Sequence, residues 1–185
     1  TIEDYENGIN LDSSAFFTVK NNTLRDNNIG LLLTSSDTNY IYNNYFDNTL
    51  NVRDSGFNIW NTSYQVGRNI LGGAYLGGNY WSSYNGSDDG SGSSPNDVVG
   101  DGIGDTDTPH MDGDIDNVGD YLPLTQFGMS LSKSADVSSA TTGDTITWTI
   151  QVNNTGSGDV NVSLSDTNGE SSTMTDLAPG QTSTE

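Results

Sequence analysis

The chain of 185 residues contains no cysteine, few basic residues and no long apolar run. The absence of cysteine excludes disulfides and thiol chemistry. Five lysine and arginine residues stand against 25 aspartates and glutamates, a formal net charge of −20. Nucleic-acid binding is excluded because it needs clustered basic side chains, and binding to an anionic membrane is disfavoured for the same reason. Without a run of about 18 apolar residues, we predict no membrane insertion.

The N-terminus also lacks a recognisable targeting signal. The sequence TIEDYENG has neither the basic start nor the apolar core of a signal peptide, so we expect a mature chain or an excerpt. The richness in Asn, Ser, Thr and Gly predicts an extracellular, cell-surface location. Five N-x-Ser/Thr sequons fit that location and are candidate glycosylation sites of a glycoprotein: Asn21, Asn61, Asn85, Asn153 and Asn161.

An acidic, glycine-rich stretch from Gly72 to Leu124 carries the strongest chemical signal. Its nearest basic residues in sequence are Arg68 and Lys133. We therefore expect a hard cation to offset the repulsion, and Ca²⁺ suits an irregular set of oxygen ligands better than Mg²⁺. The second half of the set has the spacing of EF-hand positions but departs at Asn117 and Pro123. A solvated acidic loop is the alternative. The candidate calcium ligands are Asp97, Asp101, Asp105, Asp107, Asp112, Asp114, Asp116 and Asp120.

The N-terminal part contains an internal repeat with an offset of 22 residues. Segment 8–27 aligns with segment 30–49, and a degraded third copy occupies 50–61. Short alternating apolar pairs with Ser or Asn corners predict a right-handed parallel β-helix, whereas a leucine-rich repeat would need a different frame. The apolar positions that superpose are Ile9 with Leu31, Leu11 with Leu33, Val19 with Ile41, and Leu24 with Phe46.

Asparagines recur at the same offset as the apolar positions. Asn21 and Asn43, with Asn61 as a weaker third member, are expected to stack as a ladder of side-chain amides. The alternative is that these asparagines merely occupy turns, where they tolerate left-handed backbone angles. Exposed tyrosines on the second repeat could contact sugars or another subunit, and the alternative, which we prefer, is that they are plain surface residues. That aromatic row is Tyr40, Tyr42, Tyr45 and Phe46.

The C-terminal part predicts a small antiparallel β-sandwich. Segments 146–152 and 159–166 alternate apolar and polar residues around a hairpin turn, and 172–177 is a third strand. The fold class is therefore all-β: coils over 1–72, a calcium-ordered cap over 73–127 and the sandwich over 128–185. The aromatic residues expected in the cores are Trp60, Tyr80, Trp81 and Trp148.

Two longer motifs resemble known families. The combination of GGNYWSSY with GDGIGDT and DYLPL resembles NosD-like β-helix proteins of the surfaces of methanogenic archaea, over roughly residues 7–124. The resemblance implies that this region closes the C-terminal end of a β-helix. GDTITWTIQVNNTG and LAPG resemble Ig-like repeats of prokaryotic surface proteins. Copper is often mentioned for the NosD-like family, but one soft pair, His110 and Met111, is weak evidence for a copper site.

Both ends depart from these families. NosD-like proteins usually have more coils ahead of the cap, and an Ig-like repeat usually continues with another strand, so both ends look unfinished. We therefore expect a non-enzymatic, extracellular structural protein that self-assembles head to tail by strand complementation and is rigidified by calcium. In the expected filament, sheath or surface lattice, residues 1–12 of one copy meet residues 160–185 of the next.

Two other readings are open. A carbohydrate-binding or lyase-like module would act on a cell-surface polysaccharide, and its candidate bases are Lys20, Arg25, Arg53 and Arg68. Such a lyase would need a positive cleft, which the net charge of −20 disfavours. The chain could also be one segment of a giant adhesin whose missing strand lies beyond Glu185.

Overall fold

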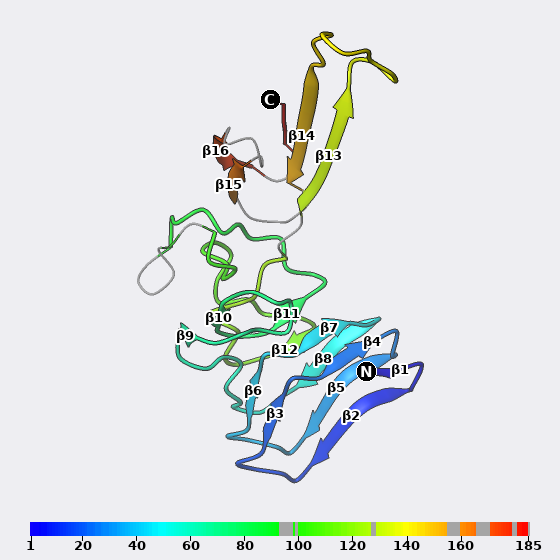
Figure 1. Cartoon of the computed structure of the whole chain (residues 1–185). Helices are drawn as coiled ribbons and strands as arrows, with labels where there is room; N and C mark the ends of the chain where they lie inside the picture. Colours follow the sequence, from blue (N-terminus) through cyan, green and yellow to red (C-terminus); the bar gives the residue numbers. More distant parts are fainter. Residues whose placement is uncertain are drawn as a thin grey trace.

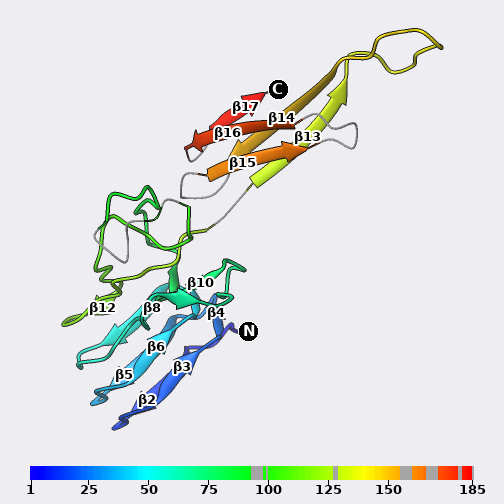
Figure 2. The same ribbon diagram turned by 60° about the vertical axis from the view of Figure 1, so that its left-hand side comes forward.

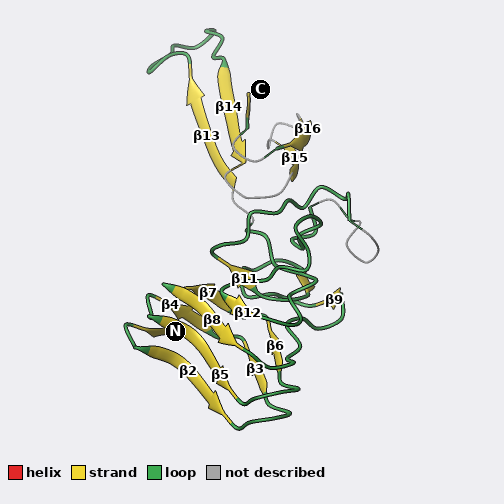
Figure 3. Cartoon of the chain, turned by 180° about the vertical axis from the view of Figure 1, so that it is seen from behind, coloured by secondary structure: helices red, strands yellow, loops and turns green. Residues whose placement is uncertain are grey.

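The structure is all-β, as predicted, and Figures 1 and 3 show strands joined by loops. It is a computed structural model that describes residues 1–92, 98, 100–126, 129–154, 160–165, 171–178 and 181–184. No helix occurs in these ranges. None of the described residues therefore forms a helix that could cross a membrane. A stack of coils lies at one end of the chain and a pair of antiparallel sheets at the other (Figure 2).

The N-terminal part is a stack of coils in which successive strands pair in parallel. We number coil 1 (1–22), coil 2 (23–44), coil 3 (45–79) and coil 4 (80–124), and each of the first two adds one strand to each of three sheets. The first sheet contains β1 (Ile2–Glu3), β4 (Thr23–Arg25), β7 (Tyr45–Asp47) and β11 (Tyr80–Trp81). The second contains β2 (Asn7–Asp12), β5 (Ile29–Thr34), β8 (Leu50–Asp54) and β12 (Asp114–Ile115). The third contains β3 (Thr18–Lys20) and β6 (Tyr40–Tyr42), extended by a bridge from Tyr40 to Ile59.

The strand register confirms the repeat of 22 residues. All four predicted apolar pairs are neighbours in the sheets, from Ile9 beside Leu31 to Leu24 beside Phe46. Because like positions stack, the side chains that point inward form one continuous core. Phe46 and Trp81 extend it into coil 4 as stacked rings 4.7 Å apart. Trp60, a predicted core residue, is fully buried beside Trp81.

Coil 3 leaves the regular path after Trp60 and returns at Asn79. The excursion contains the antiparallel pair β9 (Gln65–Val66) and β10 (Tyr75–Leu76). Its base is closed by a hydrogen bond from the Thr62 N–H to the Gly77 carbonyl, 2.9 Å long. The coil sheets then resume with β11 and β12, which lie within the predicted cap and pair with β7 and β8. A second small core of Ile103, Leu122 and Leu124 lies above them.

The C-terminal part consists of two antiparallel sheets. One contains β13 (Met129–Ala135), β14 (Trp148–Asn154) and β17 (Thr182–Thr184), and the other pairs β15 (Val160–Ser165) with β16 (Ser171–Leu177). Their shared core contains Val152, Val162, Met174 and Leu177. The expectation that Trp148 is a core residue is wrong, because its side chain is 52% exposed. β15 and β16 pack against Val152, near the opposite end of β14, which leaves Trp148 uncovered.

Candidate functional site

Asparagine ladders at the corners of the coils organise both ends of the stack. At every step except the last one to Asp54 and to Asp112, a side-chain oxygen accepts the backbone N–H of the preceding ladder residue, over 2.7–3.1 Å. Asp54 and Asp112 instead accept the side-chain amides of Asn58 and Asn51. Because the donors all face one way, each ladder has a direction. The three ladders, read from coil 1, are Tyr5–Asn27–Asn48–Asn51–Asp112, Phe17–Asn39–Asn58–Asp54 and Asn22–Asn44–Asn79–Asp120.

The ladder predicted from the sequence, Asn21 with Asn43, lies one residue away from the buried ladder that contains Asn22 and Asn44. Asn43 donates from Nδ2 to Oδ1 of Asn21 over 2.7 Å, so these two residues do pair. Both also have positive φ angles, 60° and 55°, so they are turn asparagines as well. Asn61 does not continue the pair, because the Asn43 oxygen accepts the backbone N–H of Ile70 instead. The neighbouring residues Asn22 and Asn44 form the buried ladder.

Each ladder ends at an aspartate. Amide side chains leave their N–H groups pointing toward the next coil, and an ionised carboxylate is a strong acceptor for the last of them. Asp54 accepts the Asn58 amide with both oxygens, and Asp112 accepts the Asn51 amide. These carboxylates, with Asp120, are at least nine-tenths buried. They close the stack at its cap end, because they accept hydrogen bonds from ladder N–H groups that side chains of a further coil would otherwise accept.

Asp120 is the most enclosed of the three. Its carboxylate accepts the Asn79 backbone and amide N–H groups, the Trp81 indole N–H at 2.9 Å and the Leu122 N–H at 3.0 Å. The residue is fully buried. Burial raises its pKa to about 7 because desolvation of the charged form outweighs these four donors. One side chain thus joins the ladder, the aromatic core and the cap.

Asp88 is a buried carboxylate that the sequence analysis did not single out. Its two oxygens accept the Gly100 and Gly102 N–H groups, each at 2.7 Å. Burial raises its pKa to about 7, against those two hydrogen bonds. The sequence signal was weak, because Asp88 lies in a polar turn before the acidic run and its donors come from the glycines of that run.

The two raised pKa values predict a stability that falls as the pH rises. A carboxyl group with an ordinary pKa of 3.8 and a folded pKa of about 7 favours the folded state at low pH, and this contribution is lost as the pH rises through 7. We expect the melting temperature at fixed ionic strength to fall by about 5 °C or more between pH 5.5 and 8.5. Calorimetry of Asp88→Asn/Asp120→Asn should give a flatter profile. If the melting temperature of this variant fell with pH as steeply as that of the wild type, the pH dependence could not be assigned to these two carboxyl groups.

The predicted calcium ligands do not converge. Asp112 and Asp120 end ladders, while Asp101 and Asp105 are buried and accept the Ile103 and Gly90 N–H groups. Asp114 forms an exposed ion pair with Arg53 Nε at 3.1 Å, and Asp107 and Asp116 are exposed. Asp97 lies outside the described residues.

The calcium prediction is therefore wrong. In the described ranges, no three His, Cys, Asp or Glu side chains gather as a metal site requires. Arg68 and Lys133 are the nearest basic residues in sequence, but distance along the chain does not decide which counter-charges are available. Coil stacking instead brings Arg53 to Asp114 across 61 residues, and backbone N–H groups donate to the buried carboxylates of Asp88 and Asp101. The acidic stretch is held by the fold's own donors.

His110 lies inside the cap. Its ring is 5.6 Å from the Trp81 ring and 5.2 Å from the Tyr84 ring, centre to centre. Its Nε2 is 3.2 Å from Ser83 Oγ. Burial lowers the pKa of the imidazole, although Asp112 and Asp107 oppose the shift. His110 is therefore a packed, neutral ring at pH 7.

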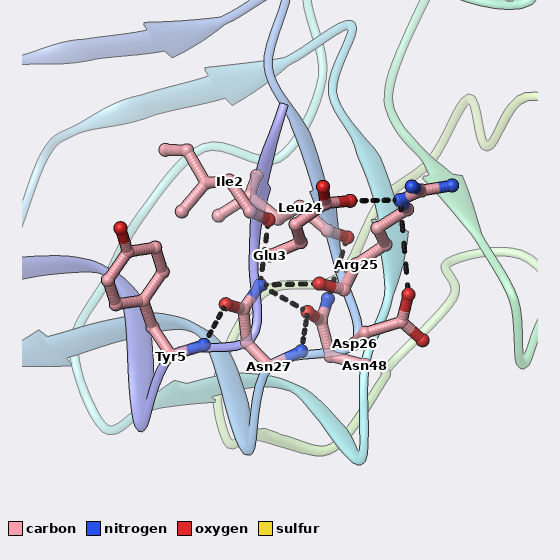
Figure 4. A network of polar contacts seen from close by, with 8 residues as sticks. All are labelled: Ile2, Glu3, Tyr5, Leu24, Arg25, Asp26, Asn27 and Asn48. Carbon is pink, nitrogen blue, oxygen red and sulfur yellow. Dashed lines mark hydrogen bonds and ion pairs between the residues drawn. The ribbon is translucent and has the colours of Figure 1, made fainter.

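At the other end of the stack, two ladders begin with an aromatic residue. Tyr5 and Phe17 hold the positions that Asn27 and Asn39 hold one coil later, since their backbone N–H groups bond to those amides. In Figure 4 the Tyr5 ring points away from the ladder, while Asn27 and Asn48 bond in sequence. Tyr5 is 63% exposed and Phe17 54%, whereas Asn27 and Asn39 are fully buried. The end of coil 1 is thus an uncovered aromatic surface.

The strands of coil 1 are also sheet edges. β1, β2 and β3 each lie at the end of a sheet, with one side paired to coil 2. Inward-facing side chains of this coil, Ile9 and Leu11, pack on the core yet are only half-buried. Phe16, beside Phe17, is 80% exposed. Natural proteins normally cover such edges, so this end is a candidate interaction surface.

The β13–β14 hairpin carries a second uncovered apolar surface. Residues paired directly across an antiparallel ladder share a face, so Leu131, Trp148 and Val152 lie on one face. Val152 is fully buried against β15 and β16, but Leu131 is 61% exposed and Trp148 52%. Lys133 Nζ lies 4.8 Å from the centre of the Trp148 ring. Figure 2 shows this hairpin extending beyond β15 and β16.

Three of the four candidate lyase bases are engaged elsewhere. Arg25 pairs with Glu3 at 2.6 Å, Arg53 with Asp114, and Lys20 Nζ lies 5.7 Å from the centre of the Tyr42 ring. Lys20, Arg25 and Arg53 lie on strands of three different sheets, and Arg68 lies between β9 and β10. The tyrosine row is also divided. Phe46 is buried in the core and Tyr45 stacks on Tyr80, while Tyr40 is 45% exposed.

The sequons differ in accessibility. Asn21, Asn85 and Asn161 are exposed, whereas Asn61 and Asn153 are half-buried. Asn61 donates from Nδ2 to the Thr62 carbonyl, and Asn153 lies beside Thr182. Glycosylation at all five remains a prediction, with the three exposed asparagines as the more accessible acceptors.

Residues 1–86 match the family described as periplasmic copper-binding protein (NosD). No curated protein and no solved structure matches the chain. The match covers coils 1 to 3 and the first residues of coil 4, and it supports the NosD-like resemblance for these residues. GDGIGDT and DYLPL lie outside it. The archaeal source and the Ig-like character of the C-terminal sheets remain predictions.

The residues of this chain do not fit the copper in the family's description. Copper sites need several converging His, Cys or Met ligands. Residues 1–86 contain none of these three residue types. His110 and Met111 lie outside the match, and His110 packs against the rings of Trp81 and Tyr84. We assign no copper chemistry to the chain.

Proposed function

We propose that this chain is an extracellular, non-enzymatic structural protein of the cell surface that assembles head to tail. The match to a periplasmic family supports a place outside the cytoplasm. The engaged arginines and the neutral, packed His110 favour a structural role over a catalytic one. The buried aspartates act within the fold, either as ends of its ladders or as acceptors of backbone N–H groups.

One observation carries the proposal: uncovered apolar surfaces lie at opposite ends of the chain. Coil 1 exposes Tyr5, Phe16 and Phe17, and the β13–β14 hairpin exposes Leu131 and Trp148. Figure 2 shows β2 and β3 of coil 1 at one end of the structure and this hairpin at the other. Exposed apolar patches on a surface that is otherwise strongly acidic mark interaction sites. Because the two patches differ, contact between them is heterologous, and a heterologous contact whose rotation does not close a ring propagates as a filament or lattice.

Sheet edges at both ends supply the backbone groups for strand complementation. β2 is an edge strand of coil 1, and β13 and β17 are the two edge strands of the three-stranded C-terminal sheet. An edge strand can add a strand from another chain through main-chain hydrogen bonds. The apolar patches would provide the affinity and the edges would set the register.

We expect the mass of the chain in solution to depend on its concentration. Light scattering should give 19.7 kDa at high dilution and an open series of multiples as the concentration rises. Moderate salt should strengthen association, because it screens repulsion between copies that each carry −20 charges. A constant 19.7 kDa at all concentrations and salt levels would contradict self-assembly, and retention of that monomer on a polysaccharide column would favour the carbohydrate-binding alternative.

A further inference from the structure

Two ladders begin with an aromatic residue, Tyr5 or Phe17, and these residues are incompatible with an ordinary coil stacked on coil 1. Wherever a coil receives its N-terminal neighbour at these corners, a side-chain oxygen accepts that neighbour's backbone N–H. Coil 1 keeps this acceptor at Asn22. Phe17 has no acceptor, and the Tyr5 ring turns away from its ladder (Figure 4).

A further coil of the same build would therefore bury two backbone N–H groups without an acceptor. Buried unpaired donors are costly, and native structures avoid them. What coil 1 offers instead is apolar: Tyr5 and Phe17 at two corners, Phe16 beside them, and half-buried Ile9 and Leu11 between. A surface of this kind suits an apolar sheet face better than a coil with polar corners.

Resting on the proposed head-to-tail assembly, we infer that the end of coil 1 docks the uncovered face of the β13–β14 hairpin from a second copy of this chain. That face carries Trp148 and Leu131, both more than half exposed. Trp148 is the anchor, because a large aromatic side chain that becomes desolvated contributes most to an interface. The partner element is thus the hairpin face, in place of the strand edges near 160–185.

Charge complements the apolar contact. Coil 1 carries Glu3, Asp4, Glu6 and Asp12 against Lys20, and of these carboxylates Glu3 pairs with Arg25 of coil 2. Lys133 is one of five basic residues in the chain and lies over the Trp148 ring on the docking face. Docking therefore brings a scarce positive charge to an acidic rim, and it fixes the orientation of one copy on the next.

Cysteine cross-linking can test this contact against the alternatives, because the natural chain has no cysteine. The head variant is Asn10→Cys on β2, and it is mixed with one tail variant at a time. Ala135→Cys lies on the docking face beside Trp148, Thr149→Cys lies on the opposite face of the same hairpin, and Thr184→Cys lies on β17. Each mixture is oxidised briefly at a concentration where the wild type associates.

We expect the mixture of Asn10→Cys with Ala135→Cys to give at least tenfold more disulfide-linked dimer than the mixture of Asn10→Cys with Thr149→Cys. Phe17→Asn, which restores the residue type of Asn39 and Asn58, should keep the melting temperature and lower the dimer yield about tenfold. Preferential linking to Thr184→Cys would overturn the docking face while leaving head-to-tail assembly intact. If only Asn10→Cys homodimers formed, or if the wild type stayed monomeric, both the docking face and head-to-tail assembly would be overturned.

Discussion

Replacing Asp120 by alanine is expected to lower the free energy of unfolding by about 3–5 kcal/mol. The substitution leaves four N–H groups from Asn79, Trp81 and Leu122 in a fully buried place without their acceptor. Small domains have a total stability of about 5–15 kcal/mol, so the variant should be close to unfolding at 37 °C. Urea denaturation followed by tryptophan fluorescence measures the change.

Two matched variants separate the ladder end from a general charge effect. Asp120→Asn keeps one acceptor oxygen and removes the buried charge, so it should lose less than half as much stability as the alanine variant at pH 8. Asp116→Ala removes an exposed carboxylate from the same acidic stretch and should change the free energy of unfolding by no more than about 0.5 kcal/mol. Equal losses for Asp120→Ala and Asp116→Ala would sink the ladder-end assignment.

A charge at either end should abolish assembly. Phe17→Asp places a carboxylate at the uncovered corner of coil 1, and Trp148→Asp removes the proposed anchor on the hairpin. Both side chains are more than half exposed, so the fold should survive while the association constant falls at least a hundredfold. Sedimentation velocity and far-ultraviolet circular dichroism measure the two properties separately.

Val66→Asp is the control for the added charge. Val66 is 83% exposed and lies on β9, away from coil 1 and from the β13–β14 hairpin. It changes the net charge by the same amount and should leave association within about threefold of the wild type. If Val66→Asp also blocked assembly, repulsion between acidic chains would explain the result without any specific contact.

The regular coils were predictable from the sequence because their contacts recur at a fixed offset. Once Gly8 aligns with Gly30, the pairing of Val19 with Ile41 follows from counting 22 residues. The all-β class and the parallel sheets could be predicted for the same reason. This logic holds only while each coil has the same length.

The ladder ends could not be found by counting, because insertions separate them from the repeat. Asn79 follows Asn44 by 35 residues and Asp120 follows Asn79 by 41, so no period connects them. The same loss of period produced the wrong calcium prediction, which missed Arg53 as the partner of Asp114. The exposed Trp148 was missed because strict alternation defines a face without showing what covers it.

The most direct test is to mix the two end-blocked variants. Phe17→Asp retains a working hairpin and Trp148→Asp retains a working coil 1, so each alone should stay at 19.7 kDa. Light scattering of the equimolar mixture should show a one-to-one dimer of twice that mass that does not grow with concentration, because both exposed ends are then blocked. A mixture that stays at 19.7 kDa, while the wild type associates, would contradict head-to-tail assembly through these two surfaces.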